Sequence, residues 1–103
     1  MTTEELKEKV VECLKTIYDP ELPVNIYELG LIYEVEVLPI NNVQIVMTLT
    51  APGCPAAQSL PIEVDQKVRQ IEGVNDVYVS VTWQPAWNKS MMSEAAALEL
   101  GFM

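Results

Sequence analysis

The sequence predicts an α+β fold, a two-layer α/β sandwich in which helices cover a three-stranded mixed sheet. Three observations predict this class. Apolar residues recur at helical spacing in three segments, strand-like alternation fills three others, and the segments follow the order α-β-β-α-β-α. The 103 residues contain no internal repeat or linker, so we expect one domain over residues 1–103.

The first helix is predicted over residues 3–17. Thr2 and Glu5 have the spacing of a capping box, and apolar residues then recur every three or four positions. The prolines of the segment 19–23 (DPELP) cannot continue a helix and should end it. Cys13 lies within the apolar stripe, so we expect it to be a small buried hydrophobe.

An antiparallel hairpin is predicted next. Residues 31–38 and 43–49 alternate between apolar and polar around a turn at 39–42. In the first strand, Leu31, Tyr33, Val35 and Val37 should share one face.

A second helix and a third strand follow the hairpin. The helix should bury Leu60, Val64, Val68 and Ile71, and Pro61 should kink it or delay its start. Residues 77–83 alternate as the third strand, and Ser93 is a plausible cap for a short final helix. Because a helix connects the second strand to the third, these two strands should be parallel. The sequence leaves open which strand the third one pairs with.

Composition excludes several classes of function. The net charge of −9, from fifteen acidic and six basic residues, makes nucleic-acid binding unfavourable. The chain has no histidine, which excludes a Cys-His pair, a Ser-His-Asp triad and histidine metal ligands. Apolar runs are too short to span a membrane, and the polar first residues do not form a secretory signal. We therefore expect a cytoplasmic protein whose two cysteines are reduced.

The segment TAPGCP, residues 50–55, contains the strongest candidate for chemistry. Pro55 suits the first position of a helix, which would place Cys54 at or next to the N-cap. Free backbone N–H groups and the helix dipole would then favour the thiolate and lower the pKa of Cys54. An accessible thiolate at this bend could bind a metal or act as a nucleophile.

Hydroxyls and carboxylates could support this thiolate. Thr48 and Thr50 precede it on the approach from the second strand, and Asp19 and Glu21 supply acids from the turn after the first helix. Each has a simpler alternative: the threonines could be solvent-side strand residues, and helix-ending turns often carry acids.

With these residues in place, the chain resembles the SufT/PaaD-like family of metal-sulfur cluster assembly factors, whose domain is called FSCA-like. The resemblance covers essentially the whole chain. It rests on segments that occur in a fixed order: Asp19–Glu21 (DPE), Asn25–Tyr33 (NIYELGLIY), Met47–Pro55 (MTLTAPGCP), Val81–Trp87 (VTWQPAW), Met92–Glu94 (MSE) and Leu100–Phe102 (LGF).

The resemblance implies a non-enzymatic adaptor or carrier in iron–sulfur cluster maturation. It assigns the reactive, metal-binding cysteine to Cys54 and the acidic turn to Asp19 and Glu21. The implied cargo is a transient iron–sulfur cluster, and the implied partners are the assembly machinery and client apo-proteins. PaaD-type members, linked to a multicomponent oxygenase, carry a cysteine-rich tail that this chain lacks, so the SufT-like branch fits better.

Ligand number limits how a cluster could be held. Iron–sulfur clusters commonly take four thiolates, and this chain offers one good candidate. Either two chains each lend Cys54, which would make a homodimer, or the chain helps a partner bind or release the cluster.

Two other functions remain open from the sequence. Cys54 could serve a thiol-based redox enzyme, although the chain has no C-x-x-C motif. The chain could also be a partner-binding module in which Cys54 is incidental. Trp83, Trp87 and the pair Met91–Met92 could form a partner surface or close the domain's own core.

Overall fold

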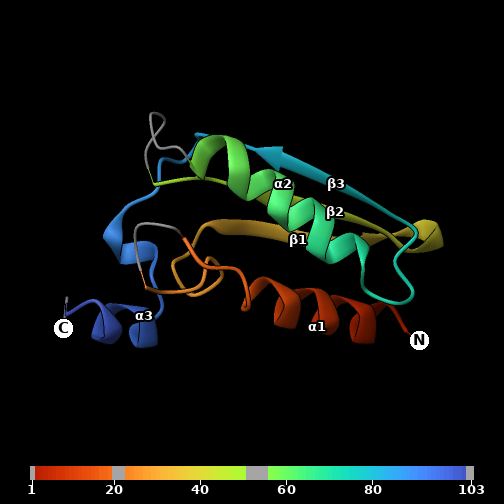
Figure 1. The fold of residues 1–103 in the computed structure, drawn as a ribbon, viewed down its shortest axis with the longest axis horizontal. Coiled ribbons are helices and arrows are strands. Elements are labelled where there is room, and N and C mark those ends of the chain that lie inside the picture. Colours follow the sequence, from red (N-terminus) through yellow and green to blue (C-terminus); the bar gives the residue numbers. More distant parts are fainter. Residues whose placement is uncertain (1, 20–22, 51–55, 102–103) are drawn as a thin grey trace.

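Three α-helices and three β-strands follow one another in the predicted order within residues 2–19, 23–50 and 56–101, which the computed structural model describes. The elements are α1 (Thr3–Leu14), β1 (Ile32–Leu38), β2 (Asn42–Met47), α2 (Ala56–Arg69), β3 (Asp76–Val81) and α3 (Glu94–Glu99), with short 3-10 turns at Pro39–Asn41 and Lys89–Met91. The α+β class and the order α-β-β-α-β-α are confirmed (Figure 1).

The sheet has the strand order β1-β2-β3, with β2 in the centre. β1 and β2 are antiparallel, and Val37 lies opposite Val43. β2 and β3 are parallel, and Val43 lies opposite Val77. The predicted strand directions are therefore confirmed, and the structure settles the open point: β3 pairs with β2.

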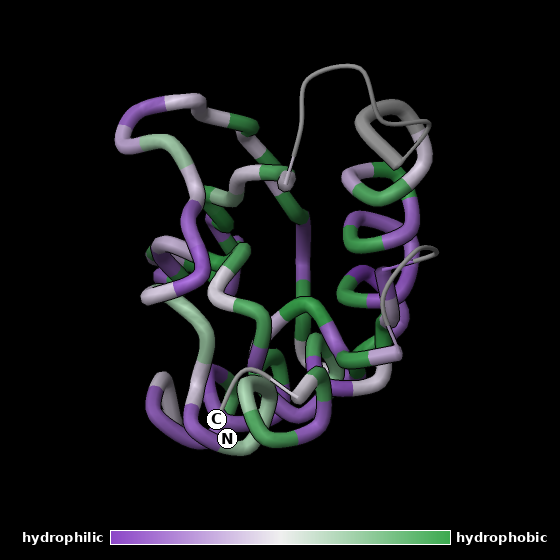
Figure 2. Tube along the Cα trace, turned by 90° about the vertical axis from the view of Figure 1, so that its left-hand side faces the viewer, coloured by the Kyte–Doolittle hydropathy of each residue, from purple (hydrophilic) through white to green (hydrophobic). Residues whose placement is uncertain are grey.

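One face of the sheet is covered by helices α1 and α2. Val43, Ile45 and Met47 of β2 are fully buried, whereas Gln44 and Val46 between them are half-buried. In Figure 2 the apolar parts of the trace lie mostly toward the inside of the molecule. The helices add these buried residues to the core: Leu6, Val10 and Leu14 from α1, and Leu60, Val64 and Val68 from α2.

Helix α1 starts as predicted and ends earlier. The Thr2 hydroxyl accepts a hydrogen bond from the Glu5 N–H at 3.1 Å, which confirms the cap. The helix ends at Leu14, and the Thr16 hydroxyl donates to the Cys13 carbonyl at 2.6 Å in the turn that follows. The prediction that it extends to residue 17 is therefore wrong.

Helix α2 continues through Pro61. The proline lies inside the helix, five residues after Ala56, where the described part of α2 begins. The predicted delay of the helix start is therefore wrong: the helix accommodates one missing N–H rather than beginning after it. None of the helices in the described part of the chain is both long and apolar enough to cross a membrane.

A bulge near the start of β1 changes the predicted alternation. The register with β2 shifts between Ile32 and Glu34, so Ile32 lies opposite the buried Met47 and packs against the core. The Tyr33 hydroxyl instead donates to the Pro85 carbonyl at 2.7 Å. Sequence alternation placed Tyr33 on the core face because it could not anticipate the extra residue of a bulge.

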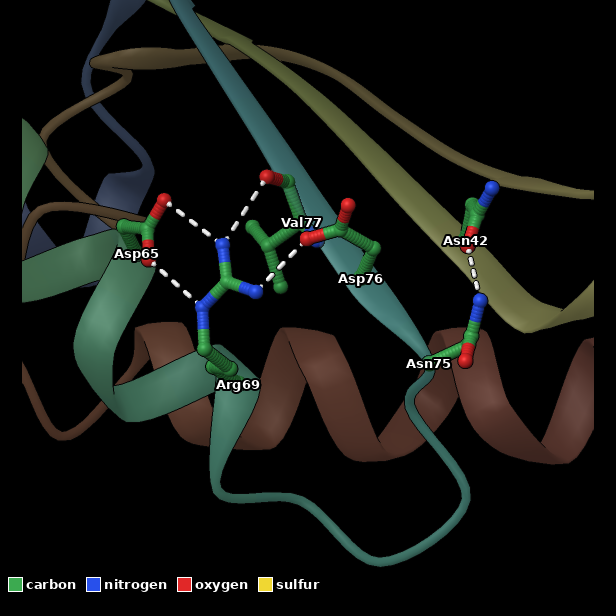
Figure 3. A network of polar contacts seen from close by, with 6 residues as sticks. All are labelled: Asn42, Asp65, Arg69, Asn75, Asp76 and Val77. Atoms are coloured by element: carbon green, nitrogen blue, oxygen red, sulfur yellow. Dashed lines mark hydrogen bonds and ion pairs between the residues drawn. The ribbon is translucent and has the colours of Figure 1, made fainter.

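Arg69 joins the end of α2 to the edge strand β3 (Figure 3). Its guanidinium contacts Asp65 at 3.0 Å, Asp76 at 2.6 Å and the Val77 carbonyl at 3.3 Å. Asp76 also accepts a hydrogen bond from the Val77 N–H at 2.9 Å. Both polar backbone groups of Val77 are thus bonded by side chains, which blocks this part of the edge from pairing with another strand.

Arg69→Met should lower the melting temperature at pH 7 more than at pH 2.5. The hydrogen bond from Arg69 is the main reason that the pKa of Asp76 lies below its usual value. A lowered pKa in the folded state adds stability above the unfolded-state pKa of about 4, and this stability is lost as the pH falls through the folded-state pKa. Thermal melts at the two pH values would measure the difference.

The matched control is Lys67→Met, which removes a similarly exposed positive charge whose ion pair with Glu63 stays within α2. Lys67→Met should lower the melting temperature at pH 7 by less than Arg69→Met does, since surface i,i+4 ion pairs contribute little to stability. An Arg69→Met deficit of equal size at both pH values would contradict the proposed role of the Arg69–Asp76 contact.

Candidate functional site

The carboxyl end of β2 joins both neighbouring strands just before the candidate segment begins. The Thr48 N–H donates to the Leu31 carbonyl at 2.8 Å, and the Thr82 N–H donates to the Met47 carbonyl at 2.8 Å. The chain entering β1 and the chain leaving β3 are therefore held at the same place. Figure 1 shows this end of the sheet at the left, opposite the N-terminus.

The turn after α1 is held against the segment that precedes β1. The Ile26 N–H donates to the Ile17 carbonyl at 2.8 Å, and Tyr18 and Asn25 form an isolated β-bridge. These contacts place Asp19 directly after the bridge, where its side chain is only 4% exposed. Asp19 is therefore a buried acid rather than an ordinary solvent-exposed turn residue.

The segment 25–31 forms a tight turn leading into β1. The Asn25 side chain accepts a hydrogen bond from the Glu28 N–H at 2.9 Å, and the Leu31 N–H donates to the Ile26 carbonyl at 3.1 Å. Gly30 has φ +84°, and a Cβ there would lie 2.3 Å from the Met91 carbonyl oxygen. Only glycine allows both this backbone conformation and this close approach.

The C-terminal segment 82–93 packs against this turn. The Trp87 indole N–H donates to the Leu29 carbonyl at 2.7 Å, and the Ser93 N–H donates to the Glu28 carbonyl at 2.8 Å. Together with the bond between Tyr33 and Pro85, these contacts join segments more than fifty residues apart in sequence. The segments 25–33 and 81–94, both noted in the sequence, are thus halves of one packed unit.

The aromatic and methionine residues of this segment have different environments. Trp87 and Met92 pack against the core, and Met91 contacts the Tyr33 hydroxyl through its sulfur at 3.4 Å. Trp83, by contrast, is 40% exposed. The alternative that these residues close the domain's own core therefore holds for Trp87 and Met92.

The start of α2 lies at the same end of the domain. α2 follows β2 and precedes β3, which is parallel to β2, so the helix runs back against both strands. Its N-terminal end therefore lies near the carboxyl ends of β2 and β3 (Figure 1). A helix N-terminus carries partial positive charge and free N–H groups, which favour an anionic group such as a thiolate.

Three of the five predicted site residues are among those that the structure describes. Asp19 is buried, Thr48 is fully buried and Thr50 is half-buried. Cys54, which was predicted as the metal ligand, and Glu21 lie outside the described residues. The described neighbours of Cys54 in sequence, Thr50 and Ala56, follow β2 and begin the described part of α2.

The environment of Thr48 differs clearly from that of a solvent-side strand residue, which was the simpler interpretation of the sequence. We considered that it could be a solvent-side strand residue, but its exposed fraction is 0%. Its hydroxyl Oγ1 is also buried and has no hydrogen-bond partner among the described residues. Burying a hydroxyl without a partner costs about 1–3 kcal/mol, so this side chain lowers the free energy of unfolding.

Cys13 is unsuited to reactive chemistry. It is half-buried on α1 and packs against the core, as predicted for a small hydrophobe, although not fully buried. Burial raises the pKa of the Cys13 thiol above its usual value, and the charge of Lys67 opposes this only in part. At neutral pH the thiol is therefore protonated and a poor nucleophile or ligand.

A ready-made metal centre is not found within the described part of the chain, where no three Cys, Asp or Glu side chains come together to hold an ion. The role of Cys54 as a metal ligand stays a prediction from the sequence.

Sequence reasoning missed the residues that assemble this end of the domain. Asn25, Gly30 and Tyr33 were noted only as parts of a motif or of an alternating strand, and Trp87 only as a candidate for a partner surface or for the core. One signal was available: a tryptophan that packs into a core usually needs a partner for its N–H. The partner itself, the Leu29 carbonyl, could not be read from the sequence.

Comparisons with known proteins agree on one family. A family model described as iron–sulfur cluster assembly protein matches residues 7–81. An Fe–S protein maturation auxiliary factor from Porphyromonas gingivalis is 53% identical over 97 residues, covering 94% of this chain and 92% of that protein. A factor of the same description from Bacillus subtilis is 39% identical over 98 residues, covering 95% and 96%.

A solved structure shares the fold. The crystal structure of a domain of unknown function from Bacillus anthracis has a TM-score of 0.90 and 37% sequence identity. The match covers 98% of this chain and 96% of that one.

Cys54 should react with iodoacetamide much faster than Cys13 in the folded protein. The pKa of the Cys13 thiol is raised by burial, whereas the pKa of Cys54 is expected to be lowered by the start of a helix. Peptide mass spectrometry after timed labelling at several pH values would give both rates, and labelling in denaturant is the control for intrinsic reactivity. Equal rates in the folded protein would contradict the different environments assigned to the two thiols.

Proposed function

The chain belongs to the family of iron–sulfur cluster assembly proteins, and we propose that it acts in iron–sulfur protein maturation as a transient carrier or adaptor that uses the Cys54 thiolate as its ligand. The observation that carries this proposal is the convergence at the carboxyl end of β2. The turn that contains Asp19, the segment 25–33, the end of β2 and the C-terminal segment are bonded together there. In the sequence, the segment that contains Cys54 follows directly after this end of β2 and leads to the described part of α2.

The proposed role is non-enzymatic. A thiol redox enzyme usually needs a second thiol to resolve its intermediate or a base to activate the first. The chain has no histidine, and Cys13 is half-buried with a raised pKa. Cys54 therefore suits the binding of soft metal ions better than redox cycling.

In this proposal the cluster is cargo, and the number of thiolate ligands that one chain offers determines how the cluster can be held. Clusters commonly take four thiolates, while one chain offers Cys54 alone. We therefore favour a cluster bridging two chains, each contributing Cys54, with Asp19, Glu21 and Thr50 as polar support around it. A free thiolate needs reducing surroundings, which are those of the cytoplasm.

The partners fitting this role are the iron–sulfur assembly machinery and client apo-proteins. Trp83, 40% exposed, follows β3, and Val81 at the end of that strand is 37% exposed. Exposed aromatic side chains are enriched in the centres of protein interfaces. This end of β3 therefore offers an apolar contact for a partner.

Cys54→Ser should abolish the support of iron–sulfur enzyme activity in cells that lack the native protein. A hydroxyl is a poor substitute for a soft thiolate ligand. The melting temperature should change little, because serine is also a good residue for a helix N-cap. Aconitase activity in extracts, measured beside a melting curve of the purified variant, tests both expectations.

The matched control is Cys13→Ser. It should lower the free energy of unfolding by about 1–3 kcal/mol if its hydroxyl finds no partner, and it should still support enzyme activity. Full support by Cys54→Ser would show that the thiol is dispensable, and the role of a structural binding module would then replace the carrier.

A further inference from the structure

The outer edge of β3 alternates between residues that bond β2 and residues that face away from it. In a strand, the N–H and C=O groups of one residue point to one side and those of the next residue to the other. The Thr82 N–H points toward β2, since it donates to the carbonyl of the last residue of that strand at 2.8 Å. Val77 points outward, since its N–H and carbonyl are bonded by the side chains of Asp76 and Arg69 (Figure 3). The odd-numbered residues of β3 therefore present their backbone groups at the outer edge.

Val79 and Val81 leave this edge open. Each directs one N–H and one C=O away from β2, and none of these four groups has a hydrogen-bond partner in the part of the chain that the structure describes. The contacts of Arg69 that close the edge stop at Val77. An open edge of this kind is a template for a further strand, which would bond the free backbone groups.

A shallow groove beside this edge has room for apolar side chains. Ile62 is 58% exposed at this groove, and Val77 shows that odd-numbered residues of β3 point to the side of the sheet that the helices cover. A strand added at the edge would therefore place every second side chain beside the groove. Its volume is about 330 Å³, and it is lined by Val79 and by four residues of α2: Pro61, Ile62, Asp65 and Gln66.

Charge distinguishes the two outer strands of the sheet. The other outer strand, β1, carries the exposed Glu34 and Glu36, which would meet like charges if β1 paired with itself. Residues 79–81 of β3 carry no charge, so they offer nothing that would select a strongly basic or acidic partner. The chain has a net charge of −9, so two copies generally repel one another. Of the two edges, that of β3 is the one at which two copies can approach without facing like charges.

We propose that a second copy of this chain occupies the open edge, and that the two β3 strands pair antiparallel about a two-fold axis at Ser80. In this register Val79 of each copy lies opposite Val81 of the other, and the two pairs exchange four backbone hydrogen bonds. These bonds use every free backbone group of the two residues. Val81, which is 37% exposed in one chain, becomes covered beside the groove of the other. The inference goes beyond the proposed function, because neither a cluster nor a cysteine ligand takes part.

The closed part of the edge selects this register. An axis at Val79 would put Val77, whose backbone groups are already bonded, opposite Val81, and two of the four bonds would be lost. An axis at Val81 would pair Val79 with Trp83, which lies beyond the end of β3. The axis at Ser80 is therefore the register that satisfies both open residues within the strand.

The test measures the mass of the metal-free protein by analytical ultracentrifugation over a range of concentrations, with chelator and reductant present. The wild type should form dimers. Ser80 is exposed and lies on the axis, so Ser80→Lys brings two like charges face to face and should raise the dissociation constant of the dimer about 10-fold. Ser80→Glu should have the same effect, whereas a mixture of the two variants should dimerise, because lysine then faces glutamate.

The matched control is Glu36→Lys on the other outer strand. It also introduces an exposed lysine, but away from the proposed axis, so the dissociation constant should not rise. Ser80→Lys and Glu36→Lys both make the net charge less negative. A loss of dimer in Ser80→Lys alone therefore cannot come from a change in the general repulsion between chains.

Hydrogen exchange of the wild type gives a second readout that needs no variant. In one chain the N–H groups of Tyr78 and Ser80 bond β2 and should exchange slowly, whereas those of Val79 and Val81 should exchange fast. In the dimer all four are bonded. Raising the protein concentration should therefore slow exchange at Val79 and Val81 and leave the other two nearly unchanged, which NMR can follow residue by residue.

A wild type that stays monomeric at every concentration would overturn the proposal. A dimer that Ser80→Lys leaves intact would also overturn it, because its interface would lie elsewhere. If the mixture of Ser80→Lys and Ser80→Glu stays monomeric, the two copies do not face each other at Ser80, and the proposed pairing is wrong. Melting curves show whether each variant folds, and if Ser80→Lys does not, the exchange rates of Val79 and Val81 decide. Cys54→Ser should dimerise as the wild type does, and a loss of its dimer would contradict an interface without a cysteine ligand.

Discussion

The backbone at the end of β2 is bonded on both sides, and the candidate site depends on this junction. The Thr48 N–H binds the chain that enters β1, and the Met47 carbonyl binds the chain that leaves β3. Because β2 is the central strand, these two bonds fix where the outer strands begin and end. The loop from β2 to α2 therefore leaves from a fixed position, which is what a ligand carried on a loop requires.

Segments that are far apart in the sequence also pack against each other near this junction. The C-terminal segment binds the turn before β1 through Trp87 and Ser93, and Gly30 provides the room for Met91. These residues assemble the site without supplying chemistry themselves. A substitution in the C-terminal segment could therefore impair function by displacing the turn before β1. Such a change would involve no contact with the cargo.

The sequence predicted most of the fold because its patterns are local. Helical and alternating spacing located the elements, and the helix between β2 and β3 settled the strand directions. It missed the early end of α1 and the bulge at the start of β1, because both depend on packing between distant residues. For the site, it identified Asp19 and Thr48, but it could not distinguish a solvent-side hydroxyl from a buried one. Thr48 is joined through its backbone to Leu31, and no local pattern of the sequence shows that contact.

The central claim is that Cys54 is the ligand through which this protein holds an iron–sulfur cluster. Anaerobic reconstitution followed by native mass spectrometry tests it most directly, because it reports the cluster and the number of chains together. We predict about one cluster for two chains in the wild type, and none in Cys54→Ser. A stable cluster on a monomer that survives Cys54→Ser would contradict the claim.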